Sequence, residues 1–373
     1  MLVDSKISRE DKSLQQSLSK LQTEAWLVFV SIIVYLLFFT YLKFGLKHDF
    51  MIGDPGSYWR YSFNLSTPFS TWWVPGYPFV IAFVRTLSFN QLPPVVVLMI
   101  VSATFYAIQI IAVYWLLSEL NVSSSLRVAL LFAVFPLVGL TYSVRAYADG
   151  MATALLVLTL LYFVKEKWGV CAIFLSMTML THKATWLFLC PLMLIAFFRY
   201  KQARVPMILA GLPLGILVLA GAFYHKDLLW FMRWSVENLF VSQSSLPVLD
   251  GVINPLISAD TGKKLKGVVV LILFLSAVYL LHRAWRSKFW LGLAICCGLV
   301  AMGLVLNQYE AFALVRFSKV IVIPAAYFLL SPSQNSIMQN LITDRASFVS
   351  IFLAAAMSNV AFAYYASRIH FGE

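Results

Sequence analysis

Long apolar runs recur along this chain, and they constrain its fold more than any other feature. A helix needs about 17–25 mostly apolar residues to cross a bilayer, and runs of this kind begin near residues 25, 94 and 205. The runs are continuous and lack the polar alternation of strands in a membrane barrel. With 61% hydrophobic and 12% charged residues, the chain is predicted to be an all-α polytopic membrane protein.

The apolar pattern predicts about eleven crossings and one membrane domain. The crossings are expected at about 25–43, 94–118, 126–142, 150–164, 168–181, 184–198, 205–223, 266–282, 289–306, 317–330 and 347–366. The apolar segment 76–89 is too short to cross, and it is interpreted as an interfacial or re-entrant helix. The domain is expected to span 25–373, after a cytoplasmic amphipathic segment 1–24, with outer loops at 44–92 and 224–265.

Basic residues set the expected orientation. The formal net charge is +12, and positive residues concentrate in cytoplasmic loops of membrane proteins. The clusters at 165–167, 199–204 and 282–288 then lie inside, with the N-terminus cytoplasmic and the C-terminus outside. The basic residues are therefore explained by orientation in a membrane and not by a nucleic-acid role. The favoured location of this multi-pass protein, a bacterial inner membrane, is a separate expectation that the charges do not establish. The charged residues 1–24 are not expected to act as a cleavable signal.

Neither disulfides nor a metal site are required by the sequence. The four cysteines lie inside apolar runs, without metal-ligand or disulfide-framework spacing (Cys171, Cys190, Cys296 and Cys297). No metal ligands are therefore assigned. A divalent metal at the acidic residues Asp49 and Asp54 remains open.

In the expected topology the unusual ionisable residues lie almost entirely on the outer side. They are Asp49, Asp54, Arg145, Asp149, His182, Lys183, Glu310, Arg316 and Lys319. Ionisable groups near membrane depth are functional candidates by default. A carboxylate can take a proton from a hydroxyl, and Arg and Lys can hold a phosphate. This combination would suit sugar transfer from a lipid phosphate in the membrane.

Four stretches carry a family resemblance. The first is Asp54-Pro-Gly-Ser-Tyr58-Trp59, which continues into Trp73-Val-Pro75-Gly76-Tyr77-Pro78; the others are 136–163, 179–194 and 309–330. In these the matching residues are Tyr147-Ala148-Asp149, Lys183 with Pro191, and Arg316 with Pro324. Together they resemble the GT-C superfamily of polytopic glycosyltransferases, in the mannosyltransferase-like branch related to the second mannosyltransferase of GPI-anchor synthesis.

The resemblance implies a function and a set of partners. It implies a GT-C-like helical bundle that moves a mannose-like hexose, with inversion, from a polyprenyl-phosphate donor. The acceptor would be a glycan, lipid or protein on the non-cytoplasmic face. The lipid-linked sugar is a co-substrate, and no other cofactor is implied.

The positions that match the GT-C motifs imply roles for individual residues of the site. Many relatives carry an adjacent acidic pair in the first loop, whereas Asp49 and Asp54 are five residues apart here. Either could be the general base, and Asp54 is favoured by its place before Pro55-Gly56. Lys183 and Arg316 would hold the donor phosphate. The expected substrate-binding residues are Tyr58, Arg145, Asp149, His182, Lys183, Glu310 and Arg316.

Structural roles compete with several of these assignments. Asp149 could simply stabilise the positive end of a helix dipole. His182 and Lys183 could reach to the membrane interface, and Glu310 with Arg316 could form a structural ion pair.

Two other functions remain open. A polysaccharide polymerase or ligase should carry an Arg-rich outer loop, yet the loop 224–265 holds only Arg233. A lipid or sugar transporter or flippase should show polar residues at mid-membrane and broken helices. The predicted clustering of polar residues at one face favours an enzyme.

Overall fold

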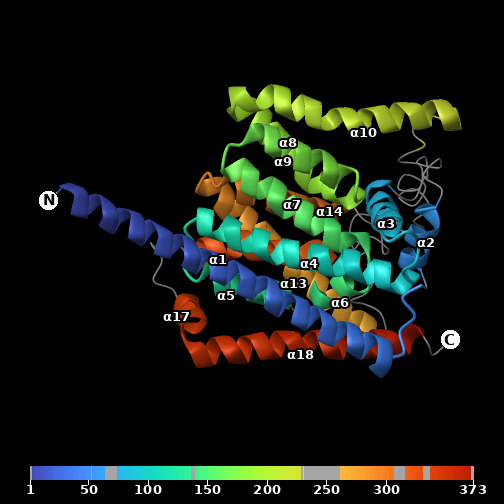
Figure 1. Cartoon of the computed structure of the whole chain (residues 1–373). Coiled ribbons are helices and arrows are strands. Elements are labelled where there is room, and N and C mark those ends of the chain that lie inside the picture. The colour runs from blue at the N-terminus through green and yellow to red at the C-terminus, as the bar shows by residue number, and fades with distance from the viewer. Residues whose placement is uncertain are drawn as a thin grey trace.

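The structure is a computed structural model, and every regular element in its described part is a helix. It describes residues 2–51, 53–63, 74–135, 139–227, 230, 261–305, 316–330 and 337–370. Long helices lie roughly side by side in one bundle (Figure 1). The predicted all-helical membrane architecture is confirmed at this level.

The elements are labelled in chain order. They are α1 (Leu2–Thr40), η1 (Tyr41–Gly45), α2 (Asp54–Tyr61), α3 (Gly76–Leu87), α4 (Pro94–Glu119), α5 (Ser125–Ala133), α6 (Gly139–Val144), α7 (Ala148–Val164), α8 (Trp168–Met179), η2 (Lys183–Thr185), α9 (Trp186–Arg199), η3 (Lys201–Ala203), α10 (Arg204–His225), α13 (Thr261–Arg286), α14 (Trp290–Val305), η4 (Ser318–Ile321), α16 (Val322–Leu330), α17 (Ile337–Thr343) and α18 (Arg345–His370).

Helices α4 and α7 form the centre of the bundle. They pack on each other, α4 also contacts α1 and α5, and α7 contacts α8. Helix α10 lies along one side of the bundle and α18 along the opposite side (Figure 1). The short helices α2 and α3 lie at the end of the bundle opposite to the projecting N-terminal end of α1 (Figure 1).

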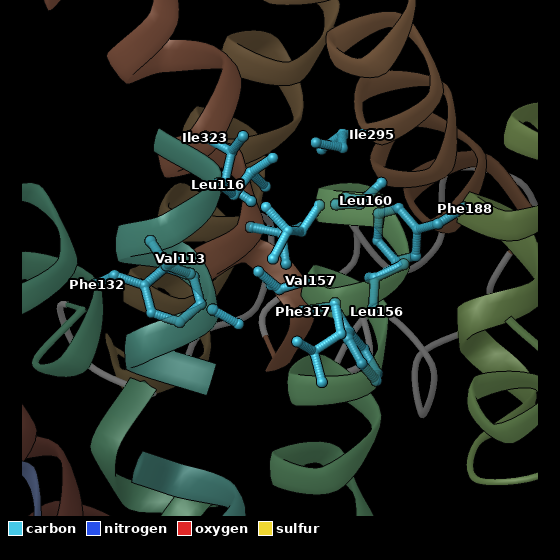
Figure 2. Packing of buried hydrophobic residues seen from close by; sticks show 14 of the residues in the cluster. Val113, Leu116, Phe132, Leu156, Val157, Leu160, Phe188, Ile295, Phe317 and Ile323 are labelled. Carbon is cyan, nitrogen blue, oxygen red and sulfur yellow. The ribbon is translucent and has the colours of Figure 1, made fainter. Parts of the chain in front are cut away.

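Tight side-chain packing joins these helices. Figure 2 shows Val113 and Leu116 of α4 among Leu156, Val157 and Leu160 of α7. Phe188 of α9, Ile295 of α14, Phe317 before η4 and Ile323 of α16 add further side chains. Lipid tails are as apolar as these side chains, so dense van der Waals contact stabilises such a core more than escape from water does.

The helices agree with the predicted crossings in position. Five helices among the described residues are long and apolar enough to cross a membrane: Leu18–Gly45, Pro94–Glu119, Lys201–His225, Val268–Arg286 and Arg345–Tyr364. The remaining predicted segments are also helical, but shorter. The structure supports an integral membrane protein; the number eleven and the direction of each crossing stay predictions.

Two predicted segments differ from the observed helices. Helix α1 runs without a break from Leu2 to Thr40, so residues 1–24 continue into the first predicted span. The third span, expected as one helix over 126–142, is divided into α5 and α6. The sequence places Pro136 between them, and a helix usually ends before the residue that precedes a proline.

A polar side chain from near the C-terminus hydrogen-bonds to backbone groups on both sides of this break. Asn359 of α18 is fully buried. Its amide nitrogen donates to the carbonyls of Val134 at 3.1 Å and Phe135 at 3.0 Å, while its oxygen accepts from the Leu140 N–H at 3.1 Å. These three backbone groups beside the break are therefore satisfied inside the protein, as membrane depth requires.

The short helices α2 and α3 form the roof over one end of the bundle. Asp54 and Pro55 begin α2, as expected for an acidic residue and a proline in a first turn. Helix α3 has 12 residues, a length of about 18 Å at 1.5 Å per residue. That is too short to cross a hydrocarbon core of about 30 Å, in agreement with the predicted exclusion of 76–89 as a span.

Candidate active site

Asp149 lies in the first turn of α7, under the roof formed by α2 and α3. Only 1% of its surface is exposed. The preceding turn places Ala146 in the left-handed region at φ 60°. The Tyr77 hydroxyl of α3 donates to the Ala146 carbonyl at 3.0 Å. This contact fixes the start of α7 and with it the position of the buried carboxylate.

Arg316 reaches Asp149 from a distant part of the sequence. Its Nη2 donates to Asp149 Oδ2, and the two side chains form an ion pair. The guanidinium carbon lies 5.2 Å from the Tyr142 ring centroid and 5.0 Å from that of Tyr147. Burial between aromatic rings strengthens both contacts, because little water screens the charges.

His182 approaches the other oxygen of Asp149. Its Nε2 lies 3.6 Å from Asp149 Oδ1, which is too long for a hydrogen bond. Its Nδ1 accepts from the Ala184 N–H at 3.1 Å at the start of η2. Burial lowers the pKa of His182 to about 4, so the ring is neutral near pH 7 with its proton on Nε2. Lys183 follows in η2 and is partly buried.

Asp54 opens α2 at the edge of this cluster and is partly exposed. Burial raises the pKa of the Asp54 carboxyl above its ordinary value, with positive Arg316 opposing the shift and negative Asp149 adding to it. One helical turn later, Tyr58 is buried edge-on against Tyr77 with ring centroids 5.0 Å apart. A partly exposed carboxyl beside buried charges can exchange a proton with a bound hydroxyl group.

Asp49 occupies a different setting. Its side chain is exposed, and its Oδ1 accepts from the Met51 N–H at 2.8 Å, closing a local turn. Among the described side chains no hydrogen bond or ion pair joins Asp49 to Asp54, Asp149 or Arg316. The geometry therefore favours Asp54 over Asp49 as the residue in contact with the cluster.

A buried lysine lies one turn beyond Arg316. Lys319 is 3% exposed, and its Nζ donates to Gln109 Oε1 at 2.8 Å and lies 3.2 Å from Ser143 Oγ. The sequence placed Lys319 on the outer side but did not identify Gln109 or Ser143 as its partners. A glutamine in the middle of the apolar α4 was the signal that could have revealed this polar cluster.

Two buried arginines of this region have hydrogen-bond donors that no described residue uses. Arg145 and Arg316, like Asp54 and Asp149, lie close enough to Tyr147 to act on it electrostatically. Arg145 is 9% exposed, and the Nε atoms of Arg145 and Arg316 have no hydrogen-bond partner in the described part of the chain. Buried donors without partners are costly, so an anion entering here would find unused N–H groups.

The described residues do not fit a divalent cation. No group of three or more His, Cys, Asp or Glu side chains lies together in the ranges that the structure describes. Asp149 already pairs with Arg316, and the surrounding cations would repel a metal ion. No step of the reaction is therefore assigned to a metal.

The predicted site residues thus fall into three groups. Asp54, Tyr58, Asp149, His182 and Arg316 lie in one cluster, with Arg145 and Lys183 next to its members. Asp49 lies apart in its own turn. Glu310 lies outside the described residues, so the alternative of a structural Glu310–Arg316 ion pair stays untested; the partner that the structure gives Arg316 is Asp149. The roles of these residues stay predictions.

The bundle belongs to a known class of membrane fold. It is similar to the oligosaccharyltransferase of Archaeoglobus fulgidus, solved in complex with zinc and sulfate, at a TM-score of 0.55 and 15% sequence identity. The match covers 91% of this chain and 53% of the oligosaccharyltransferase, so the chain spans about half the length of that protein. No protein-family model matches the sequence, and no curated protein matches it.

This likeness identifies the fold. The oligosaccharyltransferase has a GT-C fold, so the likeness shows a GT-C-like fold for this chain. Membership of the GT-C superfamily stays a prediction. The mannosyltransferase branch stays a prediction.

Proposed function

We propose that the protein is a membrane glycosyltransferase that moves a hexose from a polyprenyl-phosphate donor to an acceptor hydroxyl on the non-cytoplasmic face. One observation carries this proposal. Asp54, a partly exposed carboxyl group, lies beside the buried Arg316–Asp149 ion pair, and the Nε–H groups of Arg145 and Arg316 have no hydrogen-bond partner among the described residues. A base next to an anion-binding site is what this transfer requires.

In the proposed reaction, Asp54 acts where the new bond forms, and Arg316 and Lys183 act where the old bond breaks. Asp54 accepts the proton of the acceptor hydroxyl while the hydroxyl oxygen forms a bond to the anomeric carbon of the sugar. The bond from that carbon to the donor phosphate oxygen breaks on the opposite face, so the configuration inverts. The polyprenyl phosphate leaves with the electron pair, and Arg316 and Lys183 stabilise its negative charge.

Asp149 orients a neighbouring side chain of the site, and His182 offers a neutral hydrogen-bond donor. Asp149 orients Arg316 through their ion pair and keeps the guanidinium between Tyr142 and Tyr147. His182 is neutral near pH 7, so its Nε2–H can donate a hydrogen bond to a phosphate oxygen without adding charge. Arg145 supplies a buried donor on the same side of the cluster.

The distribution of charge along the bundle supports the proposed orientation. Lys165 pairs with Glu119 at the ends of α7 and α4, Arg199 lies over the Trp290 ring, and Arg283 lies over the Phe328 ring. These basic residues lie at helix ends away from Asp54 and Asp149. Positive residues favour the cytoplasmic side, which leaves the Asp54 cluster on the other side.

The test uses the full-length protein in membranes supplied with a labelled polyprenyl-phosphate hexose. Asp54→Asn removes the base and should lower the transfer rate by about 10²–10⁴-fold, while Asp49→Asn should leave it nearly unchanged. Both variants should retain the thermal midpoint of the parent, because Asp54 and Asp49 are partly or fully exposed. Full transfer by the Asp54→Asn variant would remove Asp54 from the mechanism.

A transporter is the second candidate, because the structure contains two features that transporters use. The third predicted span is broken, and Lys319 with Gln109 forms a buried polar cluster. However, the Asn359 side chain hydrogen-bonds to backbone groups on both sides of the break, the carbonyl of Val134 and the N–H of Leu140, so these groups are not available to a transported substrate. Movement of the lipid-linked sugar across a vesicle membrane, with no transfer to an acceptor, would favour transport instead.

A further inference from the structure

A polar cavity lies at the opposite end of the bundle from Asp54. It has a volume of about 620 Å³, within the range of about 300–1,000 Å³ that is typical of small-ligand sites. The middle of α1 and the C-terminal ends of α4 and α7 line it. Its chief lining residues are Lys20, Glu24, Trp115, Glu119, Tyr162 and Lys165.

Some of the charged side chains that line this cavity have an ion-pair or hydrogen-bond partner in the described part of the chain, and others do not. The Trp115 indole N–H donates to Glu24 Oε1 at 2.7 Å, and Lys165 Nζ lies 3.4 Å from Glu119 Oε2. Lys20 lies one turn before Glu24 on α1 and is exposed, yet among the described residues it has no ion pair. A carboxylate can accept up to about four hydrogen bonds, so Glu24 and Glu119 retain free acceptor positions.

We propose that this cavity binds the zwitterionic headgroup of an ethanolamine phospholipid from the cytoplasmic leaflet. The phosphate would pair with Lys20, and the ammonium would donate to Glu24 and Glu119. An anionic headgroup without an amine would meet two carboxylates, which disfavours it. A choline headgroup carries no N–H donor for those carboxylates, which distinguishes it from ethanolamine.

The surroundings of the cavity favour a lipid over a soluble ligand. It lies where the apolar part of α1 begins and at the C-terminal ends of α4 and α7, and the apolar parts of α1 and α4 are long enough to cross a membrane. Tyr114, Trp115 and Tyr162 line it, and Trp and Tyr are enriched at headgroup level. Helix α1 continues from the cavity with exposed apolar side chains, Trp26 at 50% and Phe29 at 62% exposure, which suit contact with acyl chains.

The test is lipid titration of the full-length protein in detergent, with bound lipid counted by native mass spectrometry. Phosphatidylethanolamine, phosphatidylcholine and phosphatidylglycerol with identical acyl chains are compared with free glycerophosphoethanolamine. Phosphatidylethanolamine should bind most tightly. Lys20→Ala and Glu24→Gln should each weaken its binding about tenfold, the loss expected for one charge-assisted hydrogen bond.

The matched control is Lys201→Ala, which removes an exposed lysine of η3 outside the cavity and should leave binding unchanged. Lys20 is exposed, so its loss should not affect folding, and an unchanged thermal midpoint would verify this. Equal binding of the three phospholipids, or no effect of Glu24→Gln, would overturn the proposal. Equally tight binding of free glycerophosphoethanolamine would overturn the assignment of a membrane lipid.

Discussion

Asp149 and Arg316 stand 167 positions apart in the sequence and form a buried ion pair. Removing one partner of such a pair leaves an uncompensated buried charge, which costs about 3–5 kcal/mol. We therefore expect Asp149→Asn and Arg316→Gln each to lower the thermal midpoint of the detergent-solubilised protein strongly. The double variant should lose much less than the sum of the two, because no single buried charge is then left behind.

The double-variant comparison separates pairing from unrelated damage. Thermal midpoints of the parent, both single variants and the double variant are measured under one condition. Strictly additive losses would show that the two side chains do not depend on each other, and the role of Asp149 in orienting Arg316 would fail with that result.

The ionisation of Asp54 should also determine how transfer activity depends on pH. A base must be ionised to act, so activity is present above its pKa and is lost as pH falls through that pKa. Because burial raises the pKa of Asp54, the acidic limb of kcat/KM should lie above about pH 3.9, the value for an exposed Asp. Residual activity of Asp54→Asn should lack this limb, whereas Asp49→Asn should keep it; an unchanged limb in Asp54→Asn would assign it to another group.

At the scale of elements, helix α3 is positioned by its first residue. The Gly76 N–H donates to the Leu180 carbonyl at 2.7 Å, next to the corner that carries His182. A Cβ atom at position 76 would lie 2.5 Å from that same carbonyl oxygen. The helix can approach the corner this closely only because residue 76 has no side chain.

Gly76→Ala should therefore displace α3 and reduce both stability and transfer. We expect a destabilisation of about 1–3 kcal/mol, the usual cost of forcing an added group into a packed site. Gly211→Ala in α10 is the matched control, because nothing lies within 4 Å of the Cβ that it adds. Thermal midpoints and transfer rates of the two variants are compared; equal behaviour would contradict the close approach.

The whole molecule has two chemically different ends, and this difference makes its orientation testable. We expect Asn90→Cys, after α3, to react with a membrane-impermeant maleimide in intact cells. Ser287→Cys, after α13, should react only once the membrane is opened. Both positions are exposed, and both variants are made after replacing the four native cysteines. The reverse labelling pattern would invert the proposed orientation and place Asp54 on the cytoplasmic side.

The sequence predicted the helical elements well because their cause is local. An apolar run must satisfy its own backbone hydrogen bonds in lipid, so its length and composition specify a helix whatever surrounds it. Segments 94–118 and 205–223 therefore correspond closely to α4 and α10. The segment 126–142 was the exception, because its apolar composition outweighed the signal of Pro136 in the prediction.

For the candidate site, the sequence alone determined which residue types are present and, through the positive-inside pattern, which of them should share a face. Their partners were decided by the tertiary structure. The sequence predicted phosphate contact for Arg316 and did not identify Asp149 as its partner, which the packing of α7 against the segment before α16 supplies. Gln109, Ser143 and Asn359 lie in apolar helices far from their partners, and only the packed bundle brings them together. Local chemistry specifies helices, whereas contacts between distant side chains depend on how those helices pack.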